Sequence, residues 1–319
     1  MNALSEDQST ESLSGPKVTA RQNSWGFVSP LFLSAAFYLT TLFALLAPLP
    51  LLLSYFRRGR TWALFGSLVN AVLVAWLAGP TSLLIYSVTV LGISWVLGES
   101  LNKKFSLEKA AFLALLSTVL LGFLVGAVLI RVYHIDLLQQ FHTQIMAVSK
   151  EWIEKSGQPL VSDSKLFSVT DFNEWKQSLW VELFPSVGVM LVLMIWVNLV
   201  LVVKANPGKI RERLVLAPAF LSHWKAPELL VWPTIVSGFF LIWDYGLTTD
   251  VSRVVFNALM AIYAIQGLSI LSAVFDLWGI RGWLRVIGYS ISLGLMIPLV
   301  LILGFFDLWF DFRGKFRQS

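Results

Sequence analysis

Residues 110–130 read AAFLALLSTVLLGFLVGAVLI and contain no acidic or basic side chain. A helix rises about 1.5 Å per residue, so a stretch of this length reaches across the ~30 Å hydrocarbon core of a bilayer. Inside that core, a single segment can satisfy its own backbone hydrogen bonds only as a helix. The stretch therefore predicts a membrane-spanning helix.

The same apolar pattern recurs along most of the chain. Hydrophobic residues make up 56% of the sequence and charged residues 13%, with a mean hydropathy of +0.72, whereas soluble proteins average about 25% charged residues. Stretches of roughly 17 to 27 residues are separated by short charged segments. The sequence predicts an all-α, multi-pass transmembrane bundle of about eight spans, at about 30–56, 61–78, 81–97, 110–130, 183–203, 229–245, 254–275 and 284–310.

The remaining segments are polar. Residues 1–28 have no helical periodicity and lack the apolar core of a cleavable signal, so we expect a disordered tail. Residues 29–312 form the predicted transmembrane domain, and 313–319 a short basic tail. Within the domain, residues 131–182 are the one polar excursion between predicted spans.

The excursion carries its own helix signals. Apolar residues at three- and four-residue spacing predict an amphipathic helix that docks on the membrane surface or on the bundle. After a break at Gly157, Asp171 and Glu174 resemble a capping box, and the helix that they begin is expected to continue into the fifth span. The apolar stripe consists of Ile135, Leu138, Phe141, Ile145, Val148 and Trp152.

Basic residues predict the orientation. Short loops on one side, at 57–60, 103–109, 204–225 and 281–285, hold about twice as many Lys and Arg residues as those on the other side. They are expected to face the cytoplasm, with both termini and the excursion outside. Three cations at 313–317 argue for the opposite placement of the C-terminus and would fit a span count different by one.

The sequence contains no catalytic signature. It has no nucleotide-binding loop, HExxH pair, GxSxG elbow or kinase motif, and it has no cysteine. The three histidines, His134, His142 and His223, are too far apart in the sequence to suggest a metal site. We therefore expect no enzyme activity, cofactor or metal, and the absence of a long basic run argues against a nucleic-acid partner.

Four amides fall at membrane depth, where a polar group needs a partner or a cavity. Each can bond a neighbouring helix or contact a ligand, and both interpretations stay open. Asn257 and Gln266 are nine residues apart, on opposite sides of one helix, and Gln266 precedes a glycine where another backbone could approach closely. We therefore expect Gln266 and Asn198 to line a common cavity, with Asn257 and Asn70 as weaker candidates.

Two further features lie within or beside predicted spans. Pro48 and Pro50 should kink or break the first span, and broken helices either line transporter sites or simply end near an interface. Asp307, Asp311 and Arg313 form a compact charged group, for which a structural ion pair or helix cap is the favoured interpretation.

A series of short motifs, taken in order, resembles the YybS-like family of bacterial membrane proteins, whose function is undefined. The resemblance covers about residues 30–313, without much of the excursion. That family is similar, more distantly, to substrate-binding membrane subunits of energy-coupling-factor vitamin transporters and to MreD-type cell-shape proteins. The motifs are Pro48-Leu-Pro50, Arg58-Gly59, Gly79-Pro80, Leu183-Phe-Pro185, Trp196-Val-Asn198, Trp224-Lys-Ala-Pro227, Trp232, Asn257, Tyr263-Ala-Ile-Gln-Gly-Leu-Ser269, Leu303-Gly304 and Asp307 to Arg313.

This resemblance implies a protein of the bacterial inner membrane that binds or moves a small hydrophobic or amphipathic molecule. Since the chain has no ATPase motif, active transport would need energising partner subunits or an ion gradient. The alternative is a non-catalytic membrane scaffold for envelope or division proteins. A ligand cavity lined by the amides would favour the first hypothesis, and a solid bundle with an apolar flank the second.

Overall fold

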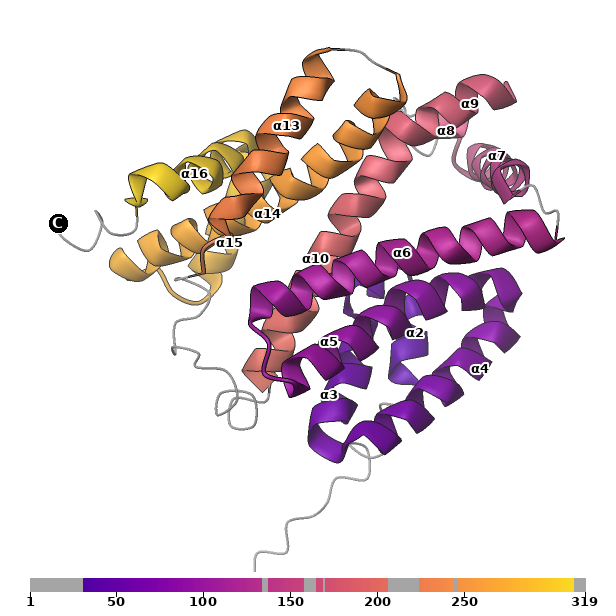
Figure 1. Ribbon diagram of the computed structural model, residues 1–319, viewed down its shortest axis with the longest axis horizontal. Coiled ribbons are helices and arrows are strands. Elements are labelled where there is room, and N and C mark those ends of the chain that lie inside the picture. The colour runs from indigo at the N-terminus through magenta and orange to yellow at the C-terminus, as the bar shows by residue number, and fades with distance from the viewer. Residues whose placement is uncertain are drawn as a thin grey trace, which may run out of the picture.

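The computed structural model describes residues 31–133, 137–157, 165–168, 170–205, 224–243 and 246–312. Every regular element in these ranges is helical (Figure 1). The predicted tails at 1–28 and 313–319 lie outside the described residues, as do the side chains of Ile135, Leu138 and Phe141.

The first half of the chain builds a layer of packed helices. In order, these are α2 (Leu33–Leu39), η2 (Ala44–Leu46), α3 (Pro48–Arg58), α4 (Arg60–Tyr86), η3 (Ser87–Leu91), α5 (Gly92–Asn102) and α6 (Leu107–Tyr133).

The second half begins with the excursion and then returns to long apolar helices. Its elements are α7 (Leu137–Ser156), α8 (Lys165–Ser168), α9 (Phe172–Ser178), η4 (Leu179–Leu183), α10 (Phe184–Ala205), η5 (Glu228–Leu230), α13 (Val231–Ile242), α14 (Leu247–Leu277), α15 (Trp283–Leu295) and α16 (Ile297–Phe310).

Fewer helices have the length of a membrane span than the sequence predicts. Four pass by length and composition: Arg60–Asn102, Leu107–Arg131, Phe172–Ala205 and Leu247–Leu277. A fifth is reached if α15 and α16, bent by 97°, count as one span. The expected number of about eight is therefore not confirmed, because α2 and α3 are interrupted and α13 is short.

The longest of these helices contains the predicted Gly79-Pro80 turn. Gly79 has φ 83° and ψ 176°, a conformation outside the helical region that glycine adopts at little cost. Figure 1 shows the chain running outward along α4 and returning along α5. Two predicted spans thus form one bent element.

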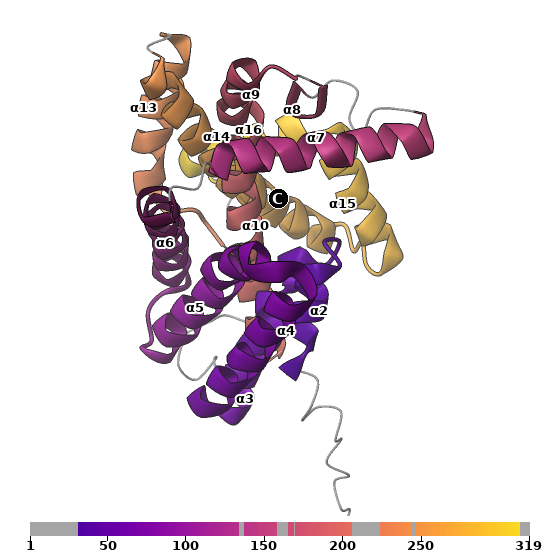
Figure 2. The ribbon, with the colours of Figure 1, turned by 90° about the vertical axis from the view of Figure 1, so that its right-hand side faces the viewer.

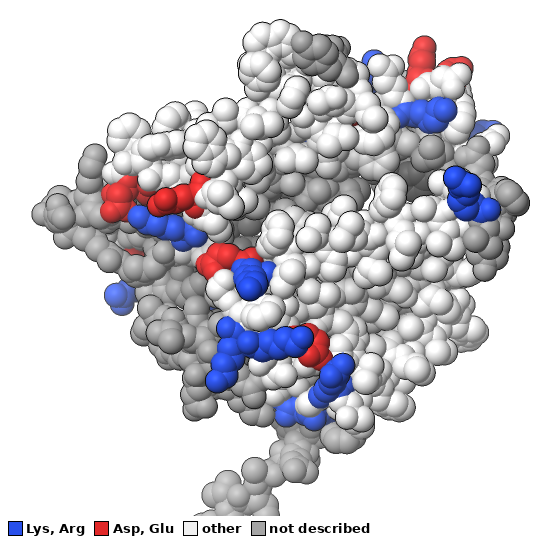
Figure 3. Space-filling view, viewed as in Figure 1, with Lys and Arg blue, Asp and Glu red and all other residues white. Residues whose placement is uncertain are grey.

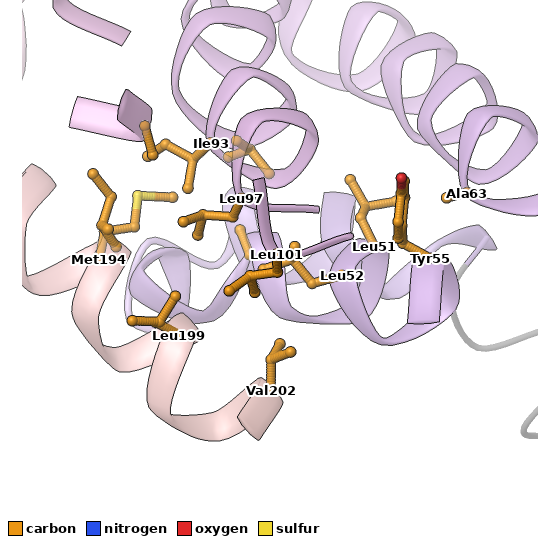
Figure 4. Packing of buried hydrophobic residues seen from close by; sticks show 14 of the residues in the cluster. Leu51, Leu52, Tyr55, Ala63, Ile93, Leu97, Leu101, Met194, Leu199 and Val202 are labelled. Atoms are coloured by element: carbon orange, nitrogen blue, oxygen red, sulfur yellow. The ribbon is translucent and has the colours of Figure 1, made fainter. Parts of the chain in front are cut away.

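The largest core lies where α3, α5 and α10 meet (Figure 4). Leu97 and Leu101 of α5 are fully buried, and they belong to one cluster with Leu51 of α3 and Leu199 of α10. This packing ties α10 to the first half of the chain, while Ala261 and Ile265 of α14 pack on Val192 of α10. α10 therefore joins the two halves.

Large apolar side chains point outward from the bundle, as expected of helices that face lipid. They lie on α4, α6, α13 and α16. Examples are Leu68, Val72, Trp76, Val119, Leu120, Phe123, Leu124, Trp232, Ile235, Val236, Phe239, Ile302 and Phe306.

The excursion covers one end of the bundle, where Figure 2 shows α7 lying across it. Asp171 caps α9 by accepting hydrogen bonds from Asn173 N and Glu174 N. The helix continues through η4 into α10, as predicted, and forms the apolar helix Phe172–Ala205.

α7 docks on α9 through a face that includes Ile145 of the predicted stripe. Ile145 and Met146 pack on the fully buried Trp175. Val148 and Trp152 are 54% and 50% exposed, so they do not pack on the bundle, and their docking on the membrane surface stays a prediction. His142, Ile145 and Met146 pack on Trp175 of α9, so the contact face is rotated by roughly a quarter turn from the predicted stripe.

Candidate functional site

Asn198 lies fully buried in the middle of α10 and reaches the break between α2 and α3. Its Nδ2 donates to Leu45 O at 2.6 Å and to Met194 O of its own helix at 2.7 Å. Its Oδ1 is buried and has no hydrogen-bond partner among the described residues. The amide thus bonds a carbonyl that the broken helix leaves available.

The two prolines start a helix rather than interrupt one. Pro48 is the first residue of α3 and Pro50 lies in its first turn, where the missing N–H groups cost little. The break itself spans the residues before them, with Thr41 at φ 56°. The predicted interruption of the first span is present, a few residues earlier in the chain.

Further side chains cover this break. Ser34 Oγ donates to Ala47 O at 2.7 Å and lies 2.7 Å from the Tyr86 hydroxyl. Asn70 on α4 accepts from Ala35 N and donates to Gly66 O, both at 2.7 Å. All these side chains are buried, so protein groups, rather than lipid, satisfy the irregular backbone.

Gln266 belongs to a second polar cluster, between α14 and α16. Its Oε1 accepts from Ala226 N at 3.0 Å, and its Nε2 donates to Asp307 Oδ2 at 3.1 Å. Asp307 Oδ1 in turn accepts from Phe312 N at 3.0 Å, and both side chains are fully buried. Asp307 therefore caps the end of its own helix, which agrees with the favoured interpretation.

An ion pair closes this cluster at the surface. Lys225 Nζ lies 2.7 Å from Asp311 Oδ1, and both side chains are about half exposed. Lys225 belongs to the basic loop that was predicted on the opposite side from the C-terminus. The contact places Asp311 beside Lys225, which argues against the predicted separation of 204–225 from the C-terminal end. Arg313 lies outside the described residues.

Two glycines allow α14 and α16 to approach closely at this point. A Cβ added to Gly304 would overlap the carbonyl oxygen of Tyr263, and one added to Gly267 would overlap that of Val300. Small residues at membrane helix crossings permit such backbone contact. The close approach expected at Gly267 is present.

The four amides do not share one site. Asn198 and Asn70 belong to the α2–α3 break, Gln266 to the α14–α16 crossing. Asn257, on the same continuous helix as Gln266, is half-buried and makes no hydrogen bond within the described ranges. A ligand-binding role for any of the four stays a prediction.

A hollow of about 430 Å³ lies elsewhere, between α13 and α14. Its lining is largely apolar and it opens to the outside of the bundle. Ser237 and Ser252 are buried small residues within it. The lining residues are Pro233, Val236, Ser237, Phe240, Leu247, Thr248, Val251, Ser252 and Val255.

The described residues include no group of three or more His, Asp or Glu side chains that could hold a metal. His142 packs instead against aromatic rings of α9, with ring centroids 4.7 Å from Trp175 and 5.5 Å from Phe172. His134 and His223 lie outside the described residues.

Comparison with known families decides the class of the protein. A family profile described as "Predicted membrane protein (DUF2232)" matches residues 28–308. The chain belongs to the DUF2232 family. Comparisons with curated proteins and with solved structures found no match. The match establishes a membrane protein, whereas the YybS-like name and the distant similarities remain predictions.

The polar clusters of this DUF2232 protein depend on partners that sequence analysis did not find. Ser34 and Tyr86 lie 52 positions apart, and Ala226 contributes only its backbone N–H to Gln266. A serine or a backbone amide carries no local signal of such a contact. The Trp224-Lys-Ala-Pro227 motif contains the residue that bonds Gln266, but the motif does not indicate which side chain it contacts.

Proposed function

We propose that this membrane protein binds a small hydrophobic or amphipathic molecule that reaches it from the bilayer, in the groove between α13 and α14. The observation that carries the proposal is the groove itself, about 430 Å³ in volume and lined mostly by apolar side chains. Apolar pockets with few polar groups are typical small-molecule sites. We further propose that the protein is not an enzyme and lies in a bacterial inner membrane.

We place the site in the groove rather than at the predicted amide pair because Gln266 and Asn198 belong to separate clusters and Gln266 is fully bonded. Both polar atoms of Gln266 are bonded, and Asn198 donates to two carbonyls. In the groove, Ser237 bonds back to Pro233 O at 2.7 Å. Ser252 makes no hydrogen bond within the described residues, so its hydroxyl is available to a ligand.

These features favour a molecule with an apolar chain and one weakly polar group. The walls formed by Val236, Phe240, Val251 and Val255 would contact the chain. The Ser252 hydroxyl would bond an ester, carbonyl or hydroxyl group. As a substrate-binding subunit, the protein would need energising partner subunits or an ion gradient for transport.

The test uses a photoreactive fatty acid added to membranes that contain the protein. Peptides from 231–255 should be labelled saturably, and Val251→Trp, which fills the groove, should abolish the saturable part. Ile235→Trp is the matched control, since Ile235 is exposed on α13 but does not line the groove. Equal labelling of both variants and the wild type would refute the proposed site.

The scaffold hypothesis also has an observation in its favour. α7 lies across the end of the bundle with Val148, Trp152 and Ile153 exposed, a surface that could receive an envelope protein. A photo-crosslinking residue at position 152 should then capture one defined protein in intact cells. Crosslinking only to lipid would exclude this surface as a protein-binding scaffold.

A further inference from the structure

The two last helices are too short to cross a membrane separately. α15 has 13 residues and α16 has 14, so each is about 20 Å long, less than the ~30 Å hydrocarbon core. They meet at Met296 with a bend of 97°. The bent pair is therefore either one broken span or a re-entrant segment.

Charge is confined to the two open ends of this pair. Arg281 and Arg285 lie at the start of α15, and Asp307 and Asp311 at the end of α16. No charged residue lies between Arg285 and Asp307. The tip at Leu295, Met296 and Ile297 is apolar and exposed. This pattern suits a hairpin whose base is at a surface and whose tip is in hydrocarbon.

Contacts fix both open ends to neighbouring segments. At the start of α15, Arg285 donates to Asp276 Oδ1 at 2.7 Å and to Ser272 O at 3.1 Å, near the end of α14. At the end of α16, Asp311 pairs with Lys225 at 2.7 Å. Straightening the pair into one span would carry Asp311 away from Lys225.

Basic residues also gather at the end of the bundle where α3, α4, α5 and α10 meet. Arg57 Nη2 donates to Ala205 O at 3.4 Å, and Arg60 lies 3.2 Å from Glu99, so the turn between α3 and α4 adjoins the ends of α5 and α10. Figure 3 shows charged side chains in a band from the C-terminal end of α16 to that turn. A broad uncharged surface separates this basic face from the charges around α7.

Exposed tryptophans mark the same boundary. Trp278 follows α14, Trp283 begins α15 and Trp309 is near the end of α16, and all three are more than half exposed. Tryptophan concentrates at the headgroup level of membranes. Both ends of the hairpin therefore carry the residues of one interface.

We propose that α15 and α16 form a re-entrant hairpin, which enters from the basic face and returns to it. Its tryptophan-rich base lies in the headgroup layer of that leaflet, and its apolar tip lies in the hydrocarbon. The C-terminus is then on the same side as 57–60 and 204–225, and its cations at 313, 315 and 317 add to the positive charge of that side. The inference does not depend on the ligand groove.

Single-cysteine labelling tests this directly because the chain contains no cysteine. Ser319→Cys, Ser222→Cys and Ser156→Cys are conservative changes at the C-terminus, in the basic loop and in the excursion. With a membrane-impermeant maleimide on sealed vesicles of known orientation, Ser319→Cys should be labelled from the same side as Ser222→Cys, and Ser156→Cys from the other. If Ser319→Cys were labelled from the same side of the membrane as Ser156→Cys, the proposal would be overturned.

A fourth variant tests whether the tip of the hairpin lies in the hydrocarbon. Leu295→Cys should resist the impermeant reagent from both sides and react with a lipid-soluble maleimide. Labelling by the impermeant reagent from the Ser156 side would show a complete crossing and would also overturn the proposal. Each variant should first show wild-type expression and thermal stability.

Discussion

Gln266 and Asp307 are bonded to each other in the interior of the bundle, with Gln266 Nε2 3.1 Å from Asp307 Oδ2. The other end of the Gln266 amide accepts from Ala226 N. One side chain thus joins α14, α16 and the segment after the basic loop. The cluster fixes the position of the C-terminal helix, and its loss should be measurable as lost stability.

Gln266→Leu should lower thermal stability. The substitution keeps an apolar side chain of similar size but leaves Ala226 N–H and Asp307 with fewer partners. An unsatisfied buried group costs about 1–3 kcal/mol, or a melting midpoint lower by about 2–4 °C per kcal/mol. Gln144→Leu, at an exposed position of α7, is the control. Equal midpoints in detergent for the two variants would contradict the assigned role.

Gly304→Ala should lower the stability of the protein more than the addition of one methyl group suggests. The added methyl group would overlap the backbone of Tyr263, and α14 and α16 would have to separate. Overpacking costs about 1–3 kcal/mol. Gly126→Ala on α6 is the matched control, since nothing lies within 4 Å of the added Cβ and alanine favours helix by up to about 1 kcal/mol. The melting temperature should therefore fall for Gly304→Ala and rise slightly for Gly126→Ala.

Asn198→Leu should destabilise the protein, whereas Asn257→Leu should be close to neutral. Asn198 bonds Leu45 O at the α2–α3 break, while Asn257 makes no hydrogen bond within the described part of the chain. Side-chain hydrogen bonds in membranes contribute about 0.6 kcal/mol on average, and the exposed carbonyl at the break adds to the loss. Limited proteolysis and melting temperature would measure the difference. A larger effect at Asn257 would point to a partner at that position.

The sequence predicts the class of fold and several local features for clear physical reasons. Apolar stretches give helices, Gly79 permits a bend and Asp171 caps α9. It does not predict which helices cross, because this depends on the rotation of each helix. The bond between Gln266 and Asp307 joins residues 41 positions apart, and the approach at Gly267 and Gly304 is what brings them together.

The same limit applies to α7, and a pair of tryptophans tests which face holds it in place. Trp175 is fully buried, and it packs near His142, Phe172 and Ile145. Trp175→Ala should cost about 3–5 kcal/mol locally, so α7 should detach from α9 and become sensitive to protease. Trp152→Ala should change neither property, because Trp152 is half exposed and is not among the residues that pack on Trp175. Digestion of the excursion at matched rates in both variants would show that packing on Trp175 does not hold α7 in place.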